Sequence, residues 1–150
     1  MESIKNEMKM EFLAASSNEG FARVAVGAFV AGLNPTVDEL ADIKTAVSEA
    51  VTNCIIHGYE QKEGHIWIQC SIEGKKVEIS VMDVGKGIAD IAQARAPMFT
   101  TKPELERSGM GFAFMEAFMD DLEVISEPFC GTLVRMKKKL GTISWIKQED

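Results

Sequence analysis

The chain has 150 residues, of which 46% are hydrophobic and 26% are charged, and this is enough for one ordinary globular domain with a substantial core. Its net charge of −7 argues against direct, nonspecific binding to nucleic acid, because such binding depends on clustered Lys and Arg. No apolar run approaches a membrane span, the first residues lack a signal-peptide core, and the three widely spaced cysteines form no CxxC pattern, so we expect a cytoplasmic protein with reduced cysteines.

The N-terminal part of the chain predicts a strand and then a helix. Residues 4–14 alternate in polarity, as in a strand with one buried side. The apolar side consists of Ile4, Met8, Met10 and Phe12. Three polar residues follow the strand and can cap a helix that runs from about residue 19 to residue 33. These candidate caps are Ser16, Ser17 and Asn18.

A second helix is predicted after Pro35. Thr36, with Glu39 three residues later, is a capping-box pattern. The helix then continues with apolar residues at helical spacing and ends near residues 57–58. The apolar stripe consists of Val37, Leu40, Ile43, Val47, Val51 and Ile55.

The next segment predicts a hairpin. Residues 65–72 and 76–83 both alternate in polarity, and the residues between them, which include Gly74, suit the connection. The expected buried positions are Ile66, Ile68, Cys70, Ile72, Val77, Ile79 and Val81. Residues 90–95 predict a short helix. Residues 96–110 predict a long loop, and loops of this length inside a compact domain are usually functional.

An apolar helix over residues 111–119 and two strands, over about 121–126 and 131–138, complete the pattern. Hairpins and helices are segregated along the chain, which favours an α/β fold. We predict a two-layer α/β sandwich with a mixed, mainly antiparallel sheet and helices on one face. We expect a single domain over residues 1–140 and a C-terminal tail over residues 141–150.

The second helix carries a pair of polar residues whose side chains can take part in chemistry. Glu49 and Asn53 lie four residues apart, so on a helix they share one face, offset from the apolar stripe. An amide oxygen is a hard ligand that suits Mg²⁺. A neighbouring carboxylate can accept a proton from a hydroxyl or from water. Taken alone, however, such a pair is more often part of a solvated helix face.

Two glycine pairs accompany this motif. Asp83 ends an apolar strand and is followed by Gly85 and Gly87, and a carboxylate there can accept the amino group of adenine. Gly109 and Gly111 precede the apolar helix, where backbone amides can bind an anion. Alone, the first pair is a turn signal and the second indicates close packing. Neither fits a Walker loop or a dinucleotide fingerprint.

In this order and combination, the three motifs resemble the GHKL ATPase superfamily, which includes gyrase B, histidine kinases and the mismatch-repair MutL proteins. The resemblance spans about residues 8–138. The N box corresponds to residues 49–58, the first glycine box to residues 83–87 and the second to residues 108–111. Within the superfamily, the chain is most similar to the anti-sigma serine kinases of spore-forming bacteria. The stretches that carry this similarity are residues 48–53, 99–112 and 118–121.

The resemblance implies a role for each matching residue. Glu49 would be the general base for a serine hydroxyl of a protein substrate, Asn53 the Mg²⁺ ligand and Asp83 the adenine-binding carboxylate. Residues 97–108 would form the ATP lid, with Arg107 reaching the terminal phosphate as a catalytic residue. The other residues implied in ATP or ADP binding are Gly85, Gly87, Thr100, Thr101, Lys102, Ser108, Gly109, Met110 and Gly111. Cys54, where alanine is common, should be a filler, and His57 should have a structural or nucleotide-shell role.

The same resemblance implies two functions. The protein would bind and inhibit a sporulation sigma factor, and it would phosphorylate a serine of the anti-anti-sigma factor with Mg-ATP. Arg23, on the first helix, would bind both partners, and the protein would be a homodimer. Three alternatives stay open: a related kinase for a stress-response sigma factor, a detached histidine-kinase-like ATPase domain, and a nucleotide-sensing binding module without transfer activity.

Overall fold

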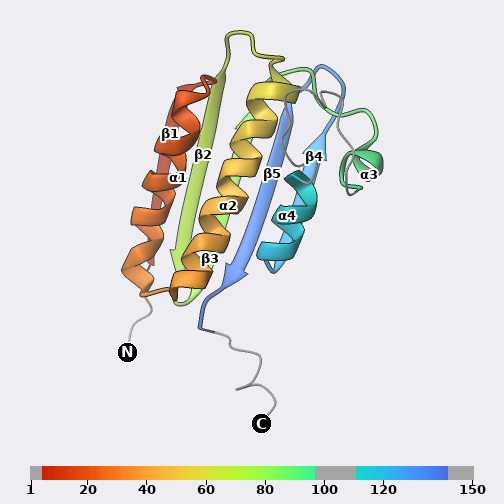
Figure 1. Ribbon diagram of the computed structural model, residues 1–150. Helices are drawn as coiled ribbons and strands as arrows, with labels where there is room; N and C mark the ends of the chain where they lie inside the picture. Colours follow the sequence, from red (N-terminus) through yellow and green to blue (C-terminus); the bar gives the residue numbers. More distant parts are fainter. Residues whose placement is uncertain (1–4, 97–110, 142–150) are drawn as a thin grey trace.

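The computed structural model describes residues 5–96 and 111–141 (Figure 1). In this part of the chain, five strands form one sheet in the order β1-β2-β3-β5-β4. The strands are β1 (Lys5–Leu13), β2 (His65–Glu73), β3 (Lys76–Asp83), β4 (Asp121–Ser126) and β5 (Thr132–Lys139). Neighbouring strands in this order are all antiparallel, so the sheet that we expected to be mixed is antiparallel throughout its described part.

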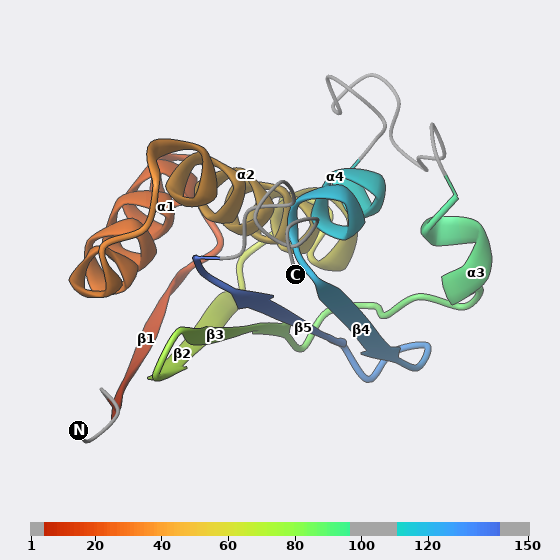
Figure 2. The ribbon, with the colours of Figure 1, turned by 90° about the horizontal axis from the view of Figure 1, so that it is seen from below.

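The helices form a second layer on one face of this sheet (Figure 2). The long helices are α1 (Ser17–Val30) and α2 (Val37–Asn53), and α4 (Gly111–Phe118) packs beside α2. The short helix α3 (Ile91–Ala94) lies to the side, beyond α4 and β4 (Figure 1). The predicted two-layer α/β sandwich is confirmed. None of the helices in the described residues is long and apolar enough to cross a membrane.

The predicted alternation of buried and exposed residues is observed in the strands. Phe12 of β1 is buried and Met8 and Met10 are half-buried, whereas Ile4 lies outside the described residues. The hairpin strands bury the predicted set, which is Ile66, Ile68, Cys70, Ile72, Val77, Ile79 and Val81. Because a one-residue slip would turn this set toward solvent, the pattern also specifies the pairing register.

Helix α1 begins at Ser17, earlier than the predicted start at about residue 19. Ser16 is the N-cap residue, but its side chain makes no capping hydrogen bond within the described residues. Asn18 instead donates to the Leu13 carbonyl at 2.9 Å, so it ties the helix to the end of β1. The prediction of a side-chain cap is therefore wrong for Ser16 and for Asn18. The helix ends in a 3-10 turn, Ala31–Leu33, close to the predicted end.

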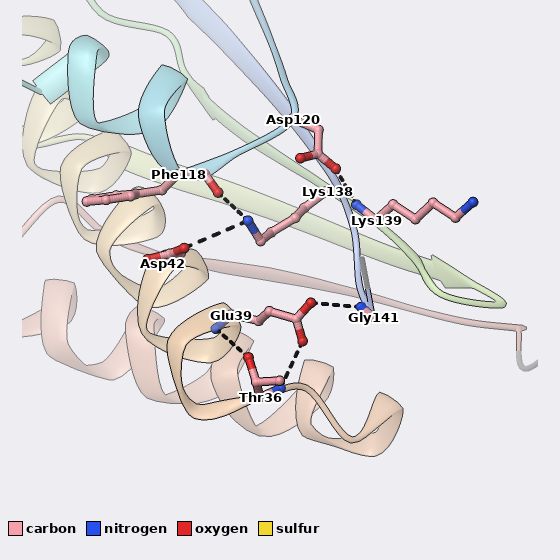
Figure 3. Close-up of polar contacts among 8 residues, drawn as sticks. All are labelled: Thr36, Glu39, Asp42, Phe118, Asp120, Lys138, Lys139 and Gly141. Atoms are coloured by element: carbon pink, nitrogen blue, oxygen red, sulfur yellow. Dashed lines mark hydrogen bonds and ion pairs between the residues drawn. The ribbon is translucent and has the colours of Figure 1, made fainter. Parts of the chain in front are cut away.

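Helix α2 begins with the predicted capping box (Figure 3). The Glu39 amide donates to Thr36 Oγ1 at 3.0 Å, and the Thr36 amide donates to Glu39 Oε1 at 2.8 Å. The second Glu39 oxygen accepts the Gly141 amide at 2.7 Å, which joins the helix start to the end of β5. Val37 is 85% exposed, so its predicted place in the buried stripe is wrong. It lies in the first turn, before the fully buried part of the stripe begins at Ile43.

Lys138 of β5 joins the two layers near the same end of the molecule (Figure 3). Its Nζ donates to the Phe118 carbonyl of α4 at 2.6 Å and lies 3.9 Å from Asp42 Oδ2 of α2. The opposite end of the sheet receives the end of α2, the end of β3 and the start of α4 (Figure 1). That end therefore gathers the three sequence motifs.

The short helix after residue 90, the apolar helix after residue 110 and the last two strands agree with the predicted ranges. Phe112, Met115 and Met119 are buried. The boundary between a domain over residues 1–140 and a tail over residues 141–150 stays a prediction, because residues 142–150 lie outside the described part.

Candidate functional site

A cavity of about 500 Å³ lies where the three motifs meet. Its walls come from the end of α2, the end of β3 with the loop that follows, α3, the start of α4 and the β4–β5 turn. The residues that line it include Asn53, Cys54, Asp83, Gly87, Gly111 and Phe129. A volume of this order suits one small-molecule ligand.

Gly111 brings the first and the third motif together. A Cβ atom at Gly111 would lie 3.2 Å from both the oxygen and the nitrogen of the Asn53 amide, and 3.4 Å from Glu49 Oε2. The carboxylate and the amide therefore face the first residue of α4 from one side of α2. This is the shared helix face that the four-residue spacing predicts.

The Asn53 amide has unused hydrogen-bonding capacity. Its Nδ2 atom is buried and has no hydrogen-bond partner among the described residues. A buried polar atom without a partner costs about 1–3 kcal/mol, which a bound ligand could offset. An amide beside a carboxylate fits Mg²⁺, since this ion usually takes few protein ligands and completes its shell with water and phosphate oxygens. Among the described residues, no group of three His, Cys, Asp or Glu could hold a metal ion.

Asp83 forms a buried acceptor in the same cavity. The residue ends β3 and is 4% exposed. Burial raises the pKa of its carboxyl group, and hydrogen bonds from the Gly85 backbone, the Cys54 thiol and the Thr132 backbone lower this pKa by a smaller amount. The Gly85 amide donates to Asp83 Oδ1 at 2.9 Å. A carboxylate in this position can bind an amino group on the edge of a ligand.

Three glycines make room for Asp83 and for the loop that follows it. A Cβ atom would lie 2.9 Å from Asp83 Oδ2 at Gly58, 2.1 Å from the Gly58 carbonyl oxygen at Gly85, and 2.2 Å from the Asp83 carbonyl oxygen at Gly131. Gly85 is absent from the described lining of the cavity, whereas Gly87 is part of it. The need for glycine at position 85 thus arises from backbone packing, and its predicted ligand contact stays a prediction.

We expect Gly85→Ala to lower the free energy of unfolding by about 1–3 kcal/mol, the usual cost of forcing extra volume into a packed site. The new Cβ would collide with backbone at Gly58, which cannot move aside like the end of a side chain. Urea unfolding measures this change. Gly32→Ala is the matched control, since no described atom lies within 4 Å of its Cβ position. Equal midpoints for the two variants would contradict the packing role of Gly85.

Helix α2 continues into a π-helical turn, Cys54–Gly58, which widens the helix end at the cavity. Such turns are frequent at functional sites. The turn presents Cys54 and His57 to the cavity. Burial and the neighbouring Asp83 carboxylate raise the pKa of the Cys54 thiol well above its ordinary value, so it stays protonated and can donate to Asp83. Cys54 is thus more than the filler that we expected.

Tyr59 ties this turn to the first glycine box, although no sequence pattern signals such a role. Its hydroxyl donates to the His65 carbonyl and accepts the Val84 amide at 2.9 Å. A second link is the Lys86 amide, which donates to the Gly58 carbonyl at 2.9 Å. Two backbone amides of the loop that contains the first glycine box are therefore held by this turn, one by the Tyr59 hydroxyl and one by the Gly58 carbonyl.

Several predicted site residues lie outside the described residues. They belong to the second glycine box and the loop before it, and their roles stay predictions. They are Thr100, Thr101, Lys102, Arg107, Ser108, Gly109 and Met110. On either side of this segment, Arg95 and Glu116 form an ion pair that joins the end of α3 to α4.

Arg23 lies on α1 and is not among the described residues that line the cavity. It is exposed and lies 3.5 Å from Glu19 in an ion pair along the helix. Two apolar neighbours on α1, Phe21 and Val24, are 57% and 59% exposed. The helix therefore presents a mixed surface of a cation and apolar side chains, separate from the cavity.

Comparison with known proteins places this arrangement in a family. The family model of the histidine kinase-like ATPase domain matches residues 14–138. The anti-sigma F factor of Thermoanaerobacter sp. (strain X514) is 61% identical, over 91% of this chain and 96% of its own. The anti-sigma F factor of Clostridium perfringens (strain SM101 / Type A) is 60% identical, over 91% and 99%. That of Bacillus subtilis (strain 168) is 57% identical, over 92% and 95%.

The chain belongs to the anti-sigma F factor family of histidine kinase-like ATPases. The predicted GHKL resemblance is therefore confirmed at the level of family and fold. An ATPase-like domain implies nucleotide binding. The described cavity of this anti-sigma F factor family member has a size that suits one small ligand, and its lining includes the buried acceptor Asp83 and the Asn53 amide, with Glu49 beside Gly111.

Proposed function

We propose that this protein is an anti-sigma factor that phosphorylates a serine of its anti-anti-sigma factor with Mg-ATP. The observation that carries this proposal is the meeting of Glu49, Asn53 and Gly111 at a cavity that also contains Asp83. ATP binding alone would need a hydrogen-bond acceptor for the adenine base and a ligand for the metal ion. A carboxylate next to that ligand adds a group that can accept a proton.

The proposed mechanism rests on positioning and charge, as is general for phosphoryl transfer. Asp83 would accept a hydrogen bond from the adenine amino group, and Asn53 would hold a Mg²⁺ ion through its amide oxygen. Magnesium, when bound, neutralises charge on the phosphates. Glu49 takes the proton of the substrate serine hydroxyl while the serine oxygen bonds to the terminal phosphorus of ATP. The bond between this phosphorus and the bridging oxygen breaks, and that oxygen leaves with ADP. Arg107 would stabilise charge on the transferred group.

The second part of the proposal is a binding function. The names of the relatives support a sigma factor as the partner, and we propose that this protein holds it in the cytoplasm as a homodimer. Exposed Arg23 and its apolar neighbours on α1 suit a shared partner surface. ADP and ATP could select different partners only through contacts that differ between the two states.

Labelled ATP tests the kinase assignment. The purified protein is incubated with a candidate anti-anti-sigma protein, and the products are separated by phosphoamino-acid analysis. Acid-stable phosphoserine on the substrate supports the proposal. Acid-labile phosphohistidine would favour the histidine-kinase-like alternative, and nucleotide binding without any transfer would favour a nucleotide-sensing module. Binding only to a stress-response sigma factor and its antagonist would favour the related stress kinase.

Arg23→Glu should abolish binding of both the sigma factor and the anti-anti-sigma factor, while ATP affinity stays near that of the wild type. An interface arginine can contribute several kcal/mol through its charge and planar donors, and reversal of charge adds repulsion. Pull-down with each partner, beside a nucleotide titration, measures the two properties separately. Lys62→Glu makes the same charge change at another exposed position and should leave both unchanged. Retained binding of both partners by Arg23→Glu would refute the shared surface.

A further inference from the structure

Phe129 is an unusual residue at the edge of the cavity. It lies in the turn between β4 and β5 and is 88% exposed, yet it belongs to the cavity lining. Its backbone φ of +64° is in the left-handed region, which is unfavourable for a residue with a Cβ atom. A residue that is both strained and water-exposed adds nothing evident to the core. Such outliers cluster at ligand sites, where the surrounding structure enforces them.

The surrounding structure holds Phe129 firmly at this edge. Its amide donates to the Lys86 carbonyl at 2.6 Å, so the turn is bonded to the first glycine box. Gly87, with a φ of +73°, packs so closely that a Cβ atom there would lie 2.0 Å from the Glu127 carbonyl oxygen. Below the turn, Ser126 Oγ accepts the Ile88 amide at 2.8 Å. The turn and the glycine box thus form one rigid wall of the cavity.

The chemistry of the other walls indicates what Phe129 would face. Asp83 is a buried acceptor, which suits the polar edge of a planar group, and Ile88 and Pro128 are apolar residues of the same lining. A heteroaromatic ring that is hydrogen-bonded through its edge keeps its two flat faces available for contact with neighbouring side chains. Aromatic side chains stack on any base because every base has a π-face.

We propose that Phe129 stacks on the base of the bound nucleotide and so contributes to affinity and to the preference for a large, purine-type ring. This inference rests on the proposed nucleotide site. It goes beyond that proposal because neither the three motifs nor the general fold requires an aromatic residue in the β4–β5 turn.

Calorimetric titration with ADP and with adenosine tests this proposal. Phe129→Leu keeps the apolar character and much of the volume but removes the π-face, and we expect its affinity to fall about 5- to 150-fold. The loss should be similar for ADP and adenosine, because the contact involves only the base. Phe129→Trp should retain affinity, and its added indole fluorescence should change on binding relative to the wild-type signal of Trp67 and Trp145.

Ile125→Ala is the matched control, since Ile125 is a half-exposed residue of the same hairpin and is not in the described cavity lining. Its affinity for ADP should equal that of the wild type. Urea unfolding should show that Phe129→Leu is no less stable than the wild type, which separates stacking from a structural role. If wild type, Phe129→Leu and Phe129→Trp bind ADP equally, the stacking proposal is overturned. If the wild type binds neither ADP nor ATP, the proposed function itself fails.

Discussion

Glu49→Gln should reduce phosphoryl transfer at least about 100-fold, the lower range of general-base effects, while ATP affinity stays close to that of the wild type. The substitution removes the ability to accept a proton and nearly preserves the shape of the side chain beside Asn53 and Gly111. Single-turnover transfer to the anti-anti-sigma substrate, with nucleotide binding measured on the same sample, separates chemistry from binding.

Two comparisons sharpen this experiment. Glu63→Gln makes the same chemical change at an exposed position in the turn before β2 and should leave transfer unchanged. Asn53→Ala should weaken binding of the nucleotide mainly when Mg²⁺ is present, because the amide is the proposed metal ligand. Near-normal transfer by Glu49→Gln would show that another group takes the proton. Loss of ATP binding in this variant would place Glu49 in binding rather than in catalysis.

Asp83→Asn should weaken ATP binding by at least about tenfold, since hydrogen bonds to charged groups contribute about 1.5–3 kcal/mol. The amide can still offer its oxygen to the adenine amino group, but the charge is lost. Calorimetric titration with ATP and ADP gives the change for each nucleotide. Normal affinity of the variant would exclude Asp83 as the adenine-binding group.

The same substitution should make the protein more stable at pH 7. Burial raises the pKa of Asp83 above its ordinary value near 3.8, so the folded state holds the proton of this carboxyl group more tightly than the unfolded state does. The stability associated with this group is therefore complete below about pH 4 and is lost as the pH rises through the raised pKa. Asparagine carries no charge to desolvate, so the advantage of Asp83→Asn should shrink as the pH falls from 7 toward 4.

Urea unfolding at several pH values measures this trend. Glu39, whose pKa is lowered, is common to both proteins, so its contribution cancels in the comparison. A variant that is less stable than the wild type at pH 7 would show that the hydrogen bonds to the carboxylate outweigh its desolvation. A more stable variant that no longer binds ATP would instead show that Asp83 is kept for function at a cost in stability.

Local patterns in the sequence predicted most of the fold because the relevant forces act over short distances along the chain. Alternating burial in the hairpin and the capping box of Thr36 and Glu39 are both set by nearby residues. The predictions for Val37 and Asn18 were wrong. Val37 lies in the first turn of its helix, before the fully buried part of the stripe, and Asn18 bonds to the Leu13 carbonyl at the end of the preceding strand, so both errors concern the exact place where a helix begins.

In the candidate site, too, local patterns in the sequence indicated some residues and missed others. The four-residue spacing of Glu49 and Asn53 and the strand-ending position of Asp83 are local signals, and the structure brings these residues to one cavity or its edge. Tyr59 and Phe129 gave no such signal. Their positions depend on contacts with Val84 and Lys86, which are distant in the sequence, and no spacing rule describes them.

The sheet order also determines when the site can exist during synthesis. β5 lies between β3 and β4, so the last described strand of the chain takes an internal place in the sheet and not an edge. Asp83 at the end of β3 is paired with Thr132 at the start of β5, and Gly131 packs on its backbone. At about 5–20 residues per second, several seconds of translation separate these two strands. A nascent chain would therefore have to expose β5 before it could bind a nucleotide, and truncation before β5 should give a chain that never does.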